Sequence, residues 1–524
     1  MAFSISSKFC RANKSQKNNR LMHAPDMKLF WLCVIALSTT SFGFILRALT
    51  LPQWGSEFNL TNTQIGEIAG VGLWPFAISI VLFSLAIDTI GYKNAILFAF
   101  VCHITSAVLT LFATGYLSLY IATFIVAIGN GTVEAVINPV VATLFSKDKT
   151  KWLNILHSGW PGGLVLAGFM TLMLGHETNW KIKMILILIP TITYGVMAWS
   201  CKFPINERVK AGISYLDMLK EVGAGGICVV TALVIFQFGS IFGWPTMVSL
   251  VITIGIVLIF GLYVKSFGQP IFVLMIILMI PLATTELGTD SWISNLMLPE
   301  MTTMGMQAGW ILVYTSTIMA VLRLFAGSIV HSISPLGLLA ISSAIACVGL
   351  LLLSVSSGMA VILAATLFAL GKTFFWPTML GIVSELFPKG GALVLNITSG
   401  VGMIAAGVIG AVILGYVQDK SVDSKMTAYD LEHHSALHDR YATDQKESLF
   451  GNYKAINPVK LATATVEEQA VINSIRDRAK KDALRTVTIF PMIMLVAYLF
   501  LIFYFKYKGG YRAVVLTDDH SKSK

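Results

Sequence analysis

Long apolar runs, each about the length of a bilayer-spanning helix, occur along most of the chain. The hydrocarbon core of a membrane is about 30 Å thick, so an α-helix rising about 1.5 Å per residue needs about 20 apolar residues to cross it. Runs of this kind, separated by polar stretches or by Gly and Pro, lie at 29–52, 65–87, 94–113, 117–145, 155–175, 184–200, 223–243, 246–264, 270–297, 308–331, 336–354, 359–386, 391–416 and 486–505. The pattern predicts an all-α integral membrane protein with about fourteen spans.

One long polar segment, 418–485, interrupts this pattern before the last span. It holds 22 charged residues, half of them acidic and half basic. Apolar residues recur at helical spacing among the charges of 466–484, which predicts short helices there. His434 and His438 stand four residues apart, but no acidic or cysteine motif accompanies them, so we expect a solvated helix face rather than a metal site.

The composition excludes a water-soluble globule. The chain is 56% hydrophobic and 12% charged, against roughly 25% charged residues in soluble domains. A net charge of +10 could indicate nucleic-acid binding, but the basic residues stand mostly at the ends of the spans rather than on one face of a soluble domain. The six cysteines are scattered singly. We therefore expect no nucleic-acid partner, no metal and no cofactor.

The basic residues orient the spans. If the N-terminus is inside, 21 Lys and Arg residues fall on its side, whereas the short loops on the other side contribute only Lys181 and Lys183. The positive-inside rule then predicts a multi-pass protein of the plasma (bacterial inner) membrane with both termini cytoplasmic and 418–485 outside. The run behind the basic N-terminus is too long for a signal peptide, so we expect a retained first span.

An internal repeat divides the chain. Gly129, Leu144-Phe145-x-Lys147 and Asn154 recur as Gly371, Leu386-Phe387-x-Lys389 and Asn396, each at an offset of 242. The repeat predicts two six-helix halves separated by two extra central helices. The expected parts are a basic N-terminus (1–28), a first half (29–201), a loop with two extra helices (202–269), five helices of the second half (270–417), the insert (418–485), a last helix (486–505) and a tail (506–524).

The loop after the second span resembles a signature of the major facilitator superfamily. It reads Ser84-Leu-Ala-Ile-Asp88-Thr-Ile-Gly91-Tyr92-Lys93, similar to the GxxxD(R/K)xGxx(R/K) pattern of those transporters, with Ser84 and Thr89 as departures. A degenerate counterpart in the second half, Gly327 to His331, follows Arg323. The resemblance implies the major facilitator fold and assigns Asp88, Lys93 and Arg323 to a cytoplasmic gate.

A second resemblance points to one group within that superfamily. Glu134-Ala-Val-Ile-Asn138-Pro139 is similar to the fourth-helix ExxxNP pattern of the fucose, galactose and glucose:proton symporters, and Asn154-Ile-Leu-His157 also looks like that group. Fucose permeases carry an acid in helix one shortly before a proline, where this chain has Arg47. A mechanism for neutral sugars therefore does not carry over directly.

Ionisable residues inside the spans are the candidate machinery. Each costs about 2.5 to 3.5 kcal/mol at the membrane centre on insertion scales, so such residues are kept where they pair or line an aqueous path. Six are present: Arg47, Glu134, Glu286, Asp290, Arg323 and Lys372. By resemblance, all but Arg323 lie on helices that line a central cavity. The alternative is that they form internal ion pairs joining the halves.

We assign proton coupling first to Glu134 and then to Glu286 and Asp290, because burial favours the neutral form of a carboxyl group and lets it load and release a proton. Arg47 and Lys372 suit an anionic group on a substrate, unless they only neutralise Glu286 and Asp290. The remaining expected substrate contacts are Asn138, Asn154, His157 and Trp292. Trp292 is chosen over Trp74, Trp160 and Trp376 because it follows Asp290 by two residues.

These features predict a secondary transporter that moves a sugar or sugar-derived acid by alternating access, coupled to protons. The alternatives are an organic-anion exchanger of the same fold and, from another class, a solute sensor that signals through 418–485. No nucleotide-binding motif and no grouped nucleophile, base and orienting residue occur, so we expect neither ATP drive nor an enzyme. The expected partners are a small polar organic solute, protons and the lipid bilayer, and we expect a monomer.

Overall fold

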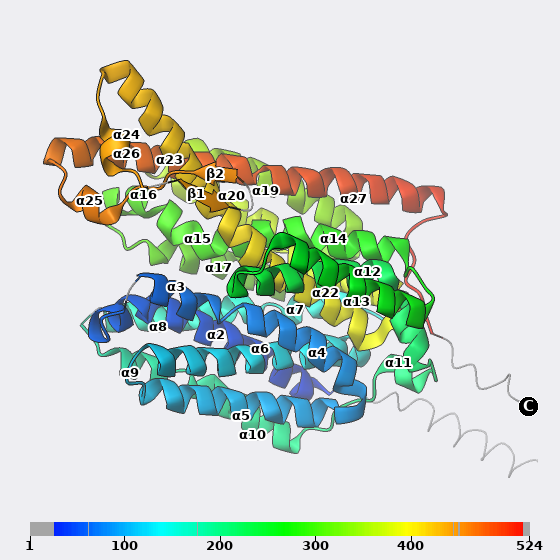
Figure 1. The fold of residues 1–524 in the computed structure, drawn as a ribbon. Coiled ribbons are helices and arrows are strands. Elements are labelled where there is room, and N and C mark those ends of the chain that lie inside the picture. The colour runs from blue at the N-terminus through cyan, green and yellow to red at the C-terminus, as the bar shows by residue number, and fades with distance from the viewer. Residues whose placement is uncertain (1–25, 61, 176, 444, 449–450, 517–524) are drawn as a thin grey trace, which may run out of the picture.

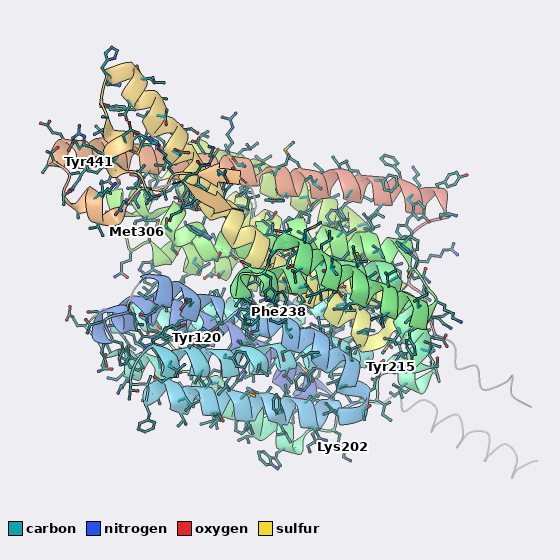
Figure 2. The ribbon with its side chains drawn as sticks, viewed as in Figure 1. Tyr120, Lys202, Tyr215, Phe238, Met306 and Tyr441 are labelled. Atoms are coloured by element: carbon teal, nitrogen blue, oxygen red, sulfur yellow. The ribbon has the colours of Figure 1, made fainter. Side chains whose placement is uncertain are left out.

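The computed structural model describes residues 26–60, 62–175, 177–443, 445–448 and 451–516. Its helices run roughly side by side in a bundle (Figure 1). Both ends of the described chain lie at one end of this bundle, which we call the terminal end, and the segment 418–485 lies at the opposite, insert end. Figure 2 shows Lys202 at the terminal end and Tyr441 at the insert end. Most of the expected basic N-terminus, 1–25, and the last eight residues lie outside the described part.

The first half is built from helices that are continuous or broken once. They are α2 (Met27–Glu57), α3 (Asn62–Gly70), α4 (Trp74–Ile90), α5 (Tyr92–Leu111), α6 (Tyr116–Leu144), α7 (Lys149–Leu156), α8 (Gly159–Leu174), α9 (Trp180–Ile185) and α10 (Leu188–Ser200). The fifth expected span is thus two helices, α7 and α8, joined at His157 and Ser158. The break matters because it places His157 inside the bundle.

Two extra helices follow the first half. After the short α11 (Glu207–Lys210), α12 (Tyr215–Phe242) and α13 (Thr246–Val264) form a hairpin. The Phe238 ring of α12 lies 5.8 Å from that of Trp74 on α4, while the rest of α12 packs on helices of the second half. Apolar side chains of α13 such as Leu258 and Leu262 are exposed, as expected for a surface that faces lipid.

The second half contains two π-helical segments. Its elements are α14 (Pro270–Ala283), η1 (Thr284–Gly288), α15 (Thr289–Leu296), α16 (Leu298–Thr303), α17 (Gly309–Leu324), α18 (Ala326–Ser332), α19 (Pro335–Val355), α20 (Ala360–Lys372), α21 (Phe375–Leu386), η2 (Pro388–Gly390), α22 (Gly391–Ile404), η3 (Ala405–Gly410), α23 (Ala411–His433) and α27 (Ile489–Tyr507). Of these, η1 and η3 are the π-helical segments.

The span prediction is confirmed in kind and nearly in number. Within the described residues, 13 helices are long and apolar enough to cross a membrane, and Gly309–Leu324 is a shorter apolar helix. That shorter helix lies in the run predicted as one span over 308–331. The chain instead breaks at Phe325, where α17 ends and α18 begins. The fold class, an all-α membrane protein with about fourteen spans, is as predicted.

The segment 418–485 forms a small folded unit at the insert end. It contains α24 (Leu437–Tyr441), α25 (Pro458–Ala462), α26 (Val466–Val487) and an antiparallel pair of strands, β1 (Lys446–Ser448) and β2 (Gly451–Tyr453). Its two long helices continue from the membrane part: α23 runs through residue 418, and α26 leads directly into α27. Apolar side chains that include Met426 and Ile472 form a separate core between them. The expected short helices are therefore part of a longer scaffold.

Two histidines of this unit form bonds within it. His438 Nε2 lies 2.7 Å from Asp423 Oδ1, and His433 Nδ1 lies 3.1 Å from the carbonyl oxygen of Tyr429. Over the described ranges, no group of three or more histidine, cysteine or acidic side chains is arranged to hold a metal ion.

The two halves repeat in packing as well as in sequence. A Cβ atom at Gly129 would lie 2.9 Å from Cys102 Cβ, and one at Gly371 would meet the backbone of Ala346, so each glycine lets the fourth helix of its half approach the third. The caps that end these helices also match: Phe145 has φ −120° and ψ 50°, and Phe387 has φ −124° and ψ 50°. The offset of 242 therefore reflects structural duplication.

Replacement of Gly371 by alanine is expected to destabilise the protein. The added methyl group must push α20 away from the Ala346 backbone, and overpacking of this kind costs about 1 to 3 kcal/mol. We predict a lower apparent melting temperature in detergent for Gly371→Ala. The matched control is Gly255→Ala on α13, where a Cβ meets nothing within 4 Å. Equal melting temperatures for the two variants would contradict the close packing.

Acid is expected to loosen the unit at the insert end. Burial alone raises the pKa of Asp430, but hydrogen bonds from the Ser435 hydroxyl and from the backbone N–H groups of Leu437 and His438 outweigh it and hold the pKa below its ordinary value of 3.8. Because the pKa of Asp430 is lower in the folded than in the unfolded state, its charged carboxylate stabilises the fold at pH values above the unfolded-state pKa. This stabilisation is lost as the pH falls through the folded-state pKa.

We therefore predict that hydrogen exchange in 430–441 speeds up below about pH 4. Asp430→Asn should show faster exchange already at neutral pH, by the equivalent of about 1 kcal/mol, because the amide cannot replace a charged acceptor. Asp439→Asn is the control, since that side chain is 84% exposed. If Asp430→Asn exchanges like the parent at neutral pH, the carboxylate does not hold this turn.

Candidate functional site

A buried cavity lies where the two halves meet. Its volume is about 20 Å³, which is room for about one water molecule, so the two walls lie close together in this structure. Residues of both halves line it: Glu134, His157, Trp160, Glu286, Leu287, Arg323, Trp376 and Met403. The cavity thus brings together four of the expected proton, substrate and gate residues. Glu134 and His157 come from the first half, and Glu286 and Arg323 come from the second, at least 129 positions further along the chain.

The first half supplies a hydrogen-bonded chain of three side chains. Glu134 and Asn138 stand one turn apart on α6 and therefore share a face, and Asn138 Nδ2 donates to Glu134 Oε2 at 2.7 Å. His157 Nε2 lies 2.9 Å from Asn138 Oδ1. His157 directly follows the end of α7, and its ring reaches α6. Asn138 thus links a carboxyl group and an imidazole, both in the cavity wall.

Arg323 is the centre of the opposite wall. Its Nη2 donates to Glu286 Oε1 at 2.7 Å, its Nε to the Thr373 carbonyl at 2.6 Å, and its Nη1 to the His157 carbonyl at 2.9 Å. The side chain is 1% exposed. The last of these bonds crosses from the second half to the first. One guanidinium therefore neutralises a buried acid and ties the two halves together.

Glu286 occupies a π-helical turn. The segment η1 lies between α14 and α15. It crosses η3 at Gly288 and Gly410, where the two backbones are in contact: a Cβ atom added to either glycine would lie 3.2 Å from the Cα atom of the other. Single π-helical turns are rare and frequently mark functional sites. The second carboxylate oxygen of Glu286 accepts from the backbone N–H of Trp376 at 3.3 Å. Two other helices of the second half, α17 and α21, therefore donate hydrogen bonds to this acid.

A second buried ion pair lies one turn from Glu286. Lys372 Nζ bonds the carboxylate of Asp290, and the lysine side chain is 0% exposed. Its ammonium group also lies 5.1 Å from the centroid of the Phe368 ring. The expectation that lysine and arginine neutralise Glu286 and Asp290 thus holds for Lys372, whereas Glu286 is neutralised by Arg323 rather than by Arg47.

Arg47 has no acidic partner among the described residues. Its Nη1 donates to the Gly43 carbonyl of its own helix at 2.8 Å, and its Nε is buried without a hydrogen-bond partner. Three residues before it, the Phe44 ring lies 6.2 Å from the ring of Trp160 in the cavity wall. Arg47 therefore stands beside the cavity rather than in its lining, as an uncompensated cation.

Three expected site residues lie elsewhere. The Trp292 ring packs against Gly415, at 3.7 Å from a Cβ placed there, because α15 turns it toward α23. Asn154 Nδ2 donates to Thr150 O at 2.9 Å and to Thr378 Oγ1 at 3.2 Å in the contact between α7 and α21. Arg323 was expected at a gate at the terminal end. It stands in the last turn of α17, just before the helix ends, and lines the central cavity.

Asp88 and Lys93 remain at the terminal end. Asp88 forms an ion pair with Arg208 of α11, and Lys93 Nζ donates to the Trp199 carbonyl at 2.9 Å. Both contacts join the loop after α4 to the segment that leaves the first half. A role for them in gating stays a prediction.

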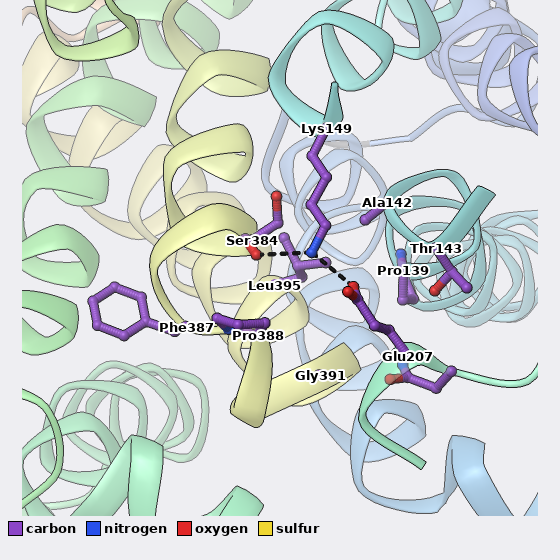
Figure 3. Close-up of a pocket in the computed structure, with 11 residues that line it drawn as sticks. Pro139, Ala142, Thr143, Lys149, Glu207, Ser384, Phe387, Pro388, Gly391 and Leu395 are labelled. Carbon is purple, nitrogen blue, oxygen red and sulfur yellow. Dashed lines mark hydrogen bonds and ion pairs between the residues drawn. The ribbon is translucent and has the colours of Figure 1, made fainter. Parts of the chain in front are cut away.

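Two tryptophans and one contact between the halves were not among the expected features of the site. Trp160 and Trp376 line the cavity in place of Trp292. Helical spacing gave no signal for Trp376, because α20 ends at Lys372 and Trp376 belongs to the next helix, α21. At the terminal end, Lys149 Nζ donates to Glu207 Oε2 at 2.7 Å and to the Ser384 carbonyl at 3.3 Å (Figure 3). No motif pointed to Lys149.

Comparisons with known proteins agree with this architecture. Residues 31–285 match the model of the Major Facilitator Superfamily. A hexuronate transporter of Bacillus subtilis (strain 168) is 26% identical over 180 residues, which are 34% of this chain and 42% of that protein. The matched part is therefore less than half the length of that relative.

Two solved structures share the fold. The transporter FucP of E. coli in its outward conformation has a TM-score of 0.52 at 16% identity, over 89% of this chain and 98% of its own. The proton:xylose symporter XylE of E. coli has a TM-score of 0.57 at 11% identity, over 90% and 95%. The first half of the chain is thus similar in sequence to the Major Facilitator Superfamily, and the chain as a whole shares the fold of these solved structures.

Proposed function

We propose that this protein is a secondary transporter that moves a sugar acid of the hexuronate class across the membrane together with protons. The observation that carries the proposal is the environment of Glu134. It lies in the wall of the central cavity, and no lysine or arginine of the described chain comes within 4.0 Å of its carboxylate. The acids of the opposite wall, in contrast, are each paired with a cation.

This difference suits proton coupling. A charged carboxylate without a cation is costly in a buried site, so Glu134 changes its interactions strongly when it gains or loses a proton. Its hydrogen bond to Asn138 carries that change to His157, whose carbonyl receives the bond from Arg323. Protonation of Glu134 is thus linked by direct contacts to a bond between the halves, and the relative movement of the halves is what alternating access requires.

The substrate class follows from the rest of the site. Trp160 and Trp376 offer aromatic faces, and Asn138 and His157 offer polar atoms for hydroxyl groups. Arg47 lacks an acidic partner beside the cavity, and guanidinium groups suit carboxylates. The hexuronate transporter among the relatives supports the same class. In the proposed orientation, the terminal end is cytoplasmic and the insert is outside.

Replacement of Glu134 by glutamine tests the coupling. The amide keeps the size and the hydrogen bond to Asn138 but cannot carry a proton. In proteoliposomes, Glu134→Gln should lose hexuronate accumulation driven by an imposed pH gradient, by about tenfold or more, and keep part of the gradient-independent exchange. Glu432→Gln, an exposed acid at the insert end, is the matched control. Accumulation at the parent level in Glu134→Gln would remove Glu134 from the coupling role.

The second candidate function is organic-anion exchange, which the unpaired Arg47 also favours. In that case, uptake needs an internal anion and ignores the pH gradient. The same proteoliposome assay with the parent protein separates the two: gradient-independent uptake that requires internal hexuronate would contradict proton symport.

Replacement of Arg47 tests the charge of the substrate. In a thermal-shift experiment, the parent should be stabilised more by a hexuronate than by the corresponding neutral hexose. Arg47→Gln should remove that difference and weaken hexuronate binding about tenfold or more, as expected for the loss of a charged hydrogen bond. Arg478→Gln, at an exposed position of α26, is the control. An unchanged preference in Arg47→Gln would mean that Arg47 has only a structural role.

A further inference from the structure

The C-terminal segment that follows α27 is bound to the contact between the halves at the terminal end. The Tyr511 hydroxyl donates to Glu385 Oε2 at 2.7 Å, and the backbone N–H of Val514 donates to the Glu385 carbonyl at 2.8 Å. The Tyr511 ring also lies 5.6 Å from the ring of Phe505 on α27. Residues 508–516, which we call the tail clamp, therefore rest on the second half.

Glu385 uses its other carboxylate oxygen to bind the first half. Oε1 accepts from Thr150 Oγ1 at 2.5 Å and from the backbone N–H of Thr150 at 3.2 Å. Glu385 stands near the end of α21 and Thr150 at the start of α7. One carboxylate thus holds the tail with one oxygen and the opposite half with the other.

The neighbouring residues strengthen the same contact. Lys149, next to Thr150, donates to the carbonyl of Ser384, next to Glu385, and also binds Glu207 of α11. These groups surround a second cavity, lined among others by Thr143 and Gly391 (Figure 3). A Cβ at Gly381 would touch Thr150, so α7 and α21 lie in close contact here. The terminal end is closed at this point in the structure.

We propose that the tail clamp regulates opening between α7 and α21 at the terminal end, which we call the terminal-end gate, by stabilising the closed state. The Tyr511 hydroxyl fixes the side chain of Glu385 in the orientation that meets Thr150. When the gate opens, α7 and α21 must separate, and the bonds between Glu385 and Thr150 must break. The bonds of the tail to Glu385 lie within the second half and need not break. The tail therefore favours the closed state by keeping the Glu385 side chain in the orientation that binds Thr150. Loss of the tail is expected to shift the equilibrium toward the open state.

Regulation of opening by the tail clamp rests on the proposed transport function, but the experiment that tests it needs no substrate. The reporter is Thr143→Cys in the wall of the second cavity, in a background with the six native cysteines replaced. The full-length protein is reconstituted into vesicles and exposed to a membrane-impermeant maleimide at the terminal end. Opening of the gate exposes the reporter, so the labelling rate reports the fraction of open protein.

Two pairs of variants isolate the clamp. Tyr511→Phe keeps the ring and loses the hydroxyl, and its control is Tyr507→Phe, whose side chain is 90% exposed. Deletion of 509–524 removes the clamp, and its control is deletion of 517–524. We expect Tyr511→Phe and the longer deletion to raise the labelling rate about three- to tenfold, as for the loss of one charged hydrogen bond in one state, and the controls to leave it unchanged.

A third variant tests whether the clamp acts through Glu385. Thr150→Val removes the hydroxyl on the opposite half and should itself raise the rate. Tyr511→Phe should then add less in the Thr150→Val background than in the parent, because both changes weaken one contact. Unchanged labelling in Tyr511→Phe and in the longer deletion, or fully additive effects, would overturn the proposal. If the labelling rates change as expected but the protein shows no hexuronate uptake, the proposed function is rejected and the proposal for the tail clamp still stands.

Discussion

The structure depends on a single guanidinium group at the centre of the bundle. Arg323 is almost completely buried, and all three of its donor nitrogens are used: one for Glu286, one for the Thr373 carbonyl and one for the His157 carbonyl. A buried pair of charges is costly to break from one side, because the remaining charge is left without compensation. The bond to His157 is the only one of the three that crosses between the halves. The same charge that satisfies Glu286 therefore also fixes how closely the halves approach.

Around this centre, the two walls of the cavity differ in charge. In the second half, Glu286 is paired with Arg323 and nearby Asp290 with Lys372, whereas in the first half Glu134 has only an amide beside it. Of these acids, the one without a cation is where the gain or loss of a proton changes the electrostatic energy most. The π-helical turn that holds Glu286 and the break that exposes the His157 carbonyl are both departures from regular helix. Irregular backbone at membrane depth is tolerated where protein buries it or where it lines a cavity.

The contact at the terminal end follows a similar logic on a smaller scale. Glu385 joins the halves through Thr150 and is itself oriented by the tail, just as Glu286 is oriented by α21 and bound by Arg323. In both places one carboxylate accepts bonds from two elements. A shared acceptor of this kind couples the two elements, because a local change in one element alters a bond of the other.

Much of the architecture could be read from the sequence. The apolar runs predicted the number and order of the spans, since backbone groups in lipid must be satisfied within helices and about 20 residues are needed to cross. The repeat at an offset of 242 predicted two duplicated halves, and the glycine contacts of Gly129 and Gly371 match. The positions of the intramembrane charges also identified Glu134, Glu286 and Arg323 as residues to examine, because such residues are costly unless they have partners.

What the sequence could not decide was which residues face one another. Helical spacing places Glu286 and Asp290 on one side of a helix, but it does not say that Arg323 pairs with the first and Lys372 with the second, or that Arg47 has neither. Trp376 rather than Trp292 lines the cavity because local turns and π-helical segments rotate the helices. The loop resemblance alone also did not show that Arg323 lines the central cavity. Periodicity along one helix determines its faces, whereas the pairing of faces depends on contacts between helices far apart in the chain, which only the tertiary structure supplies.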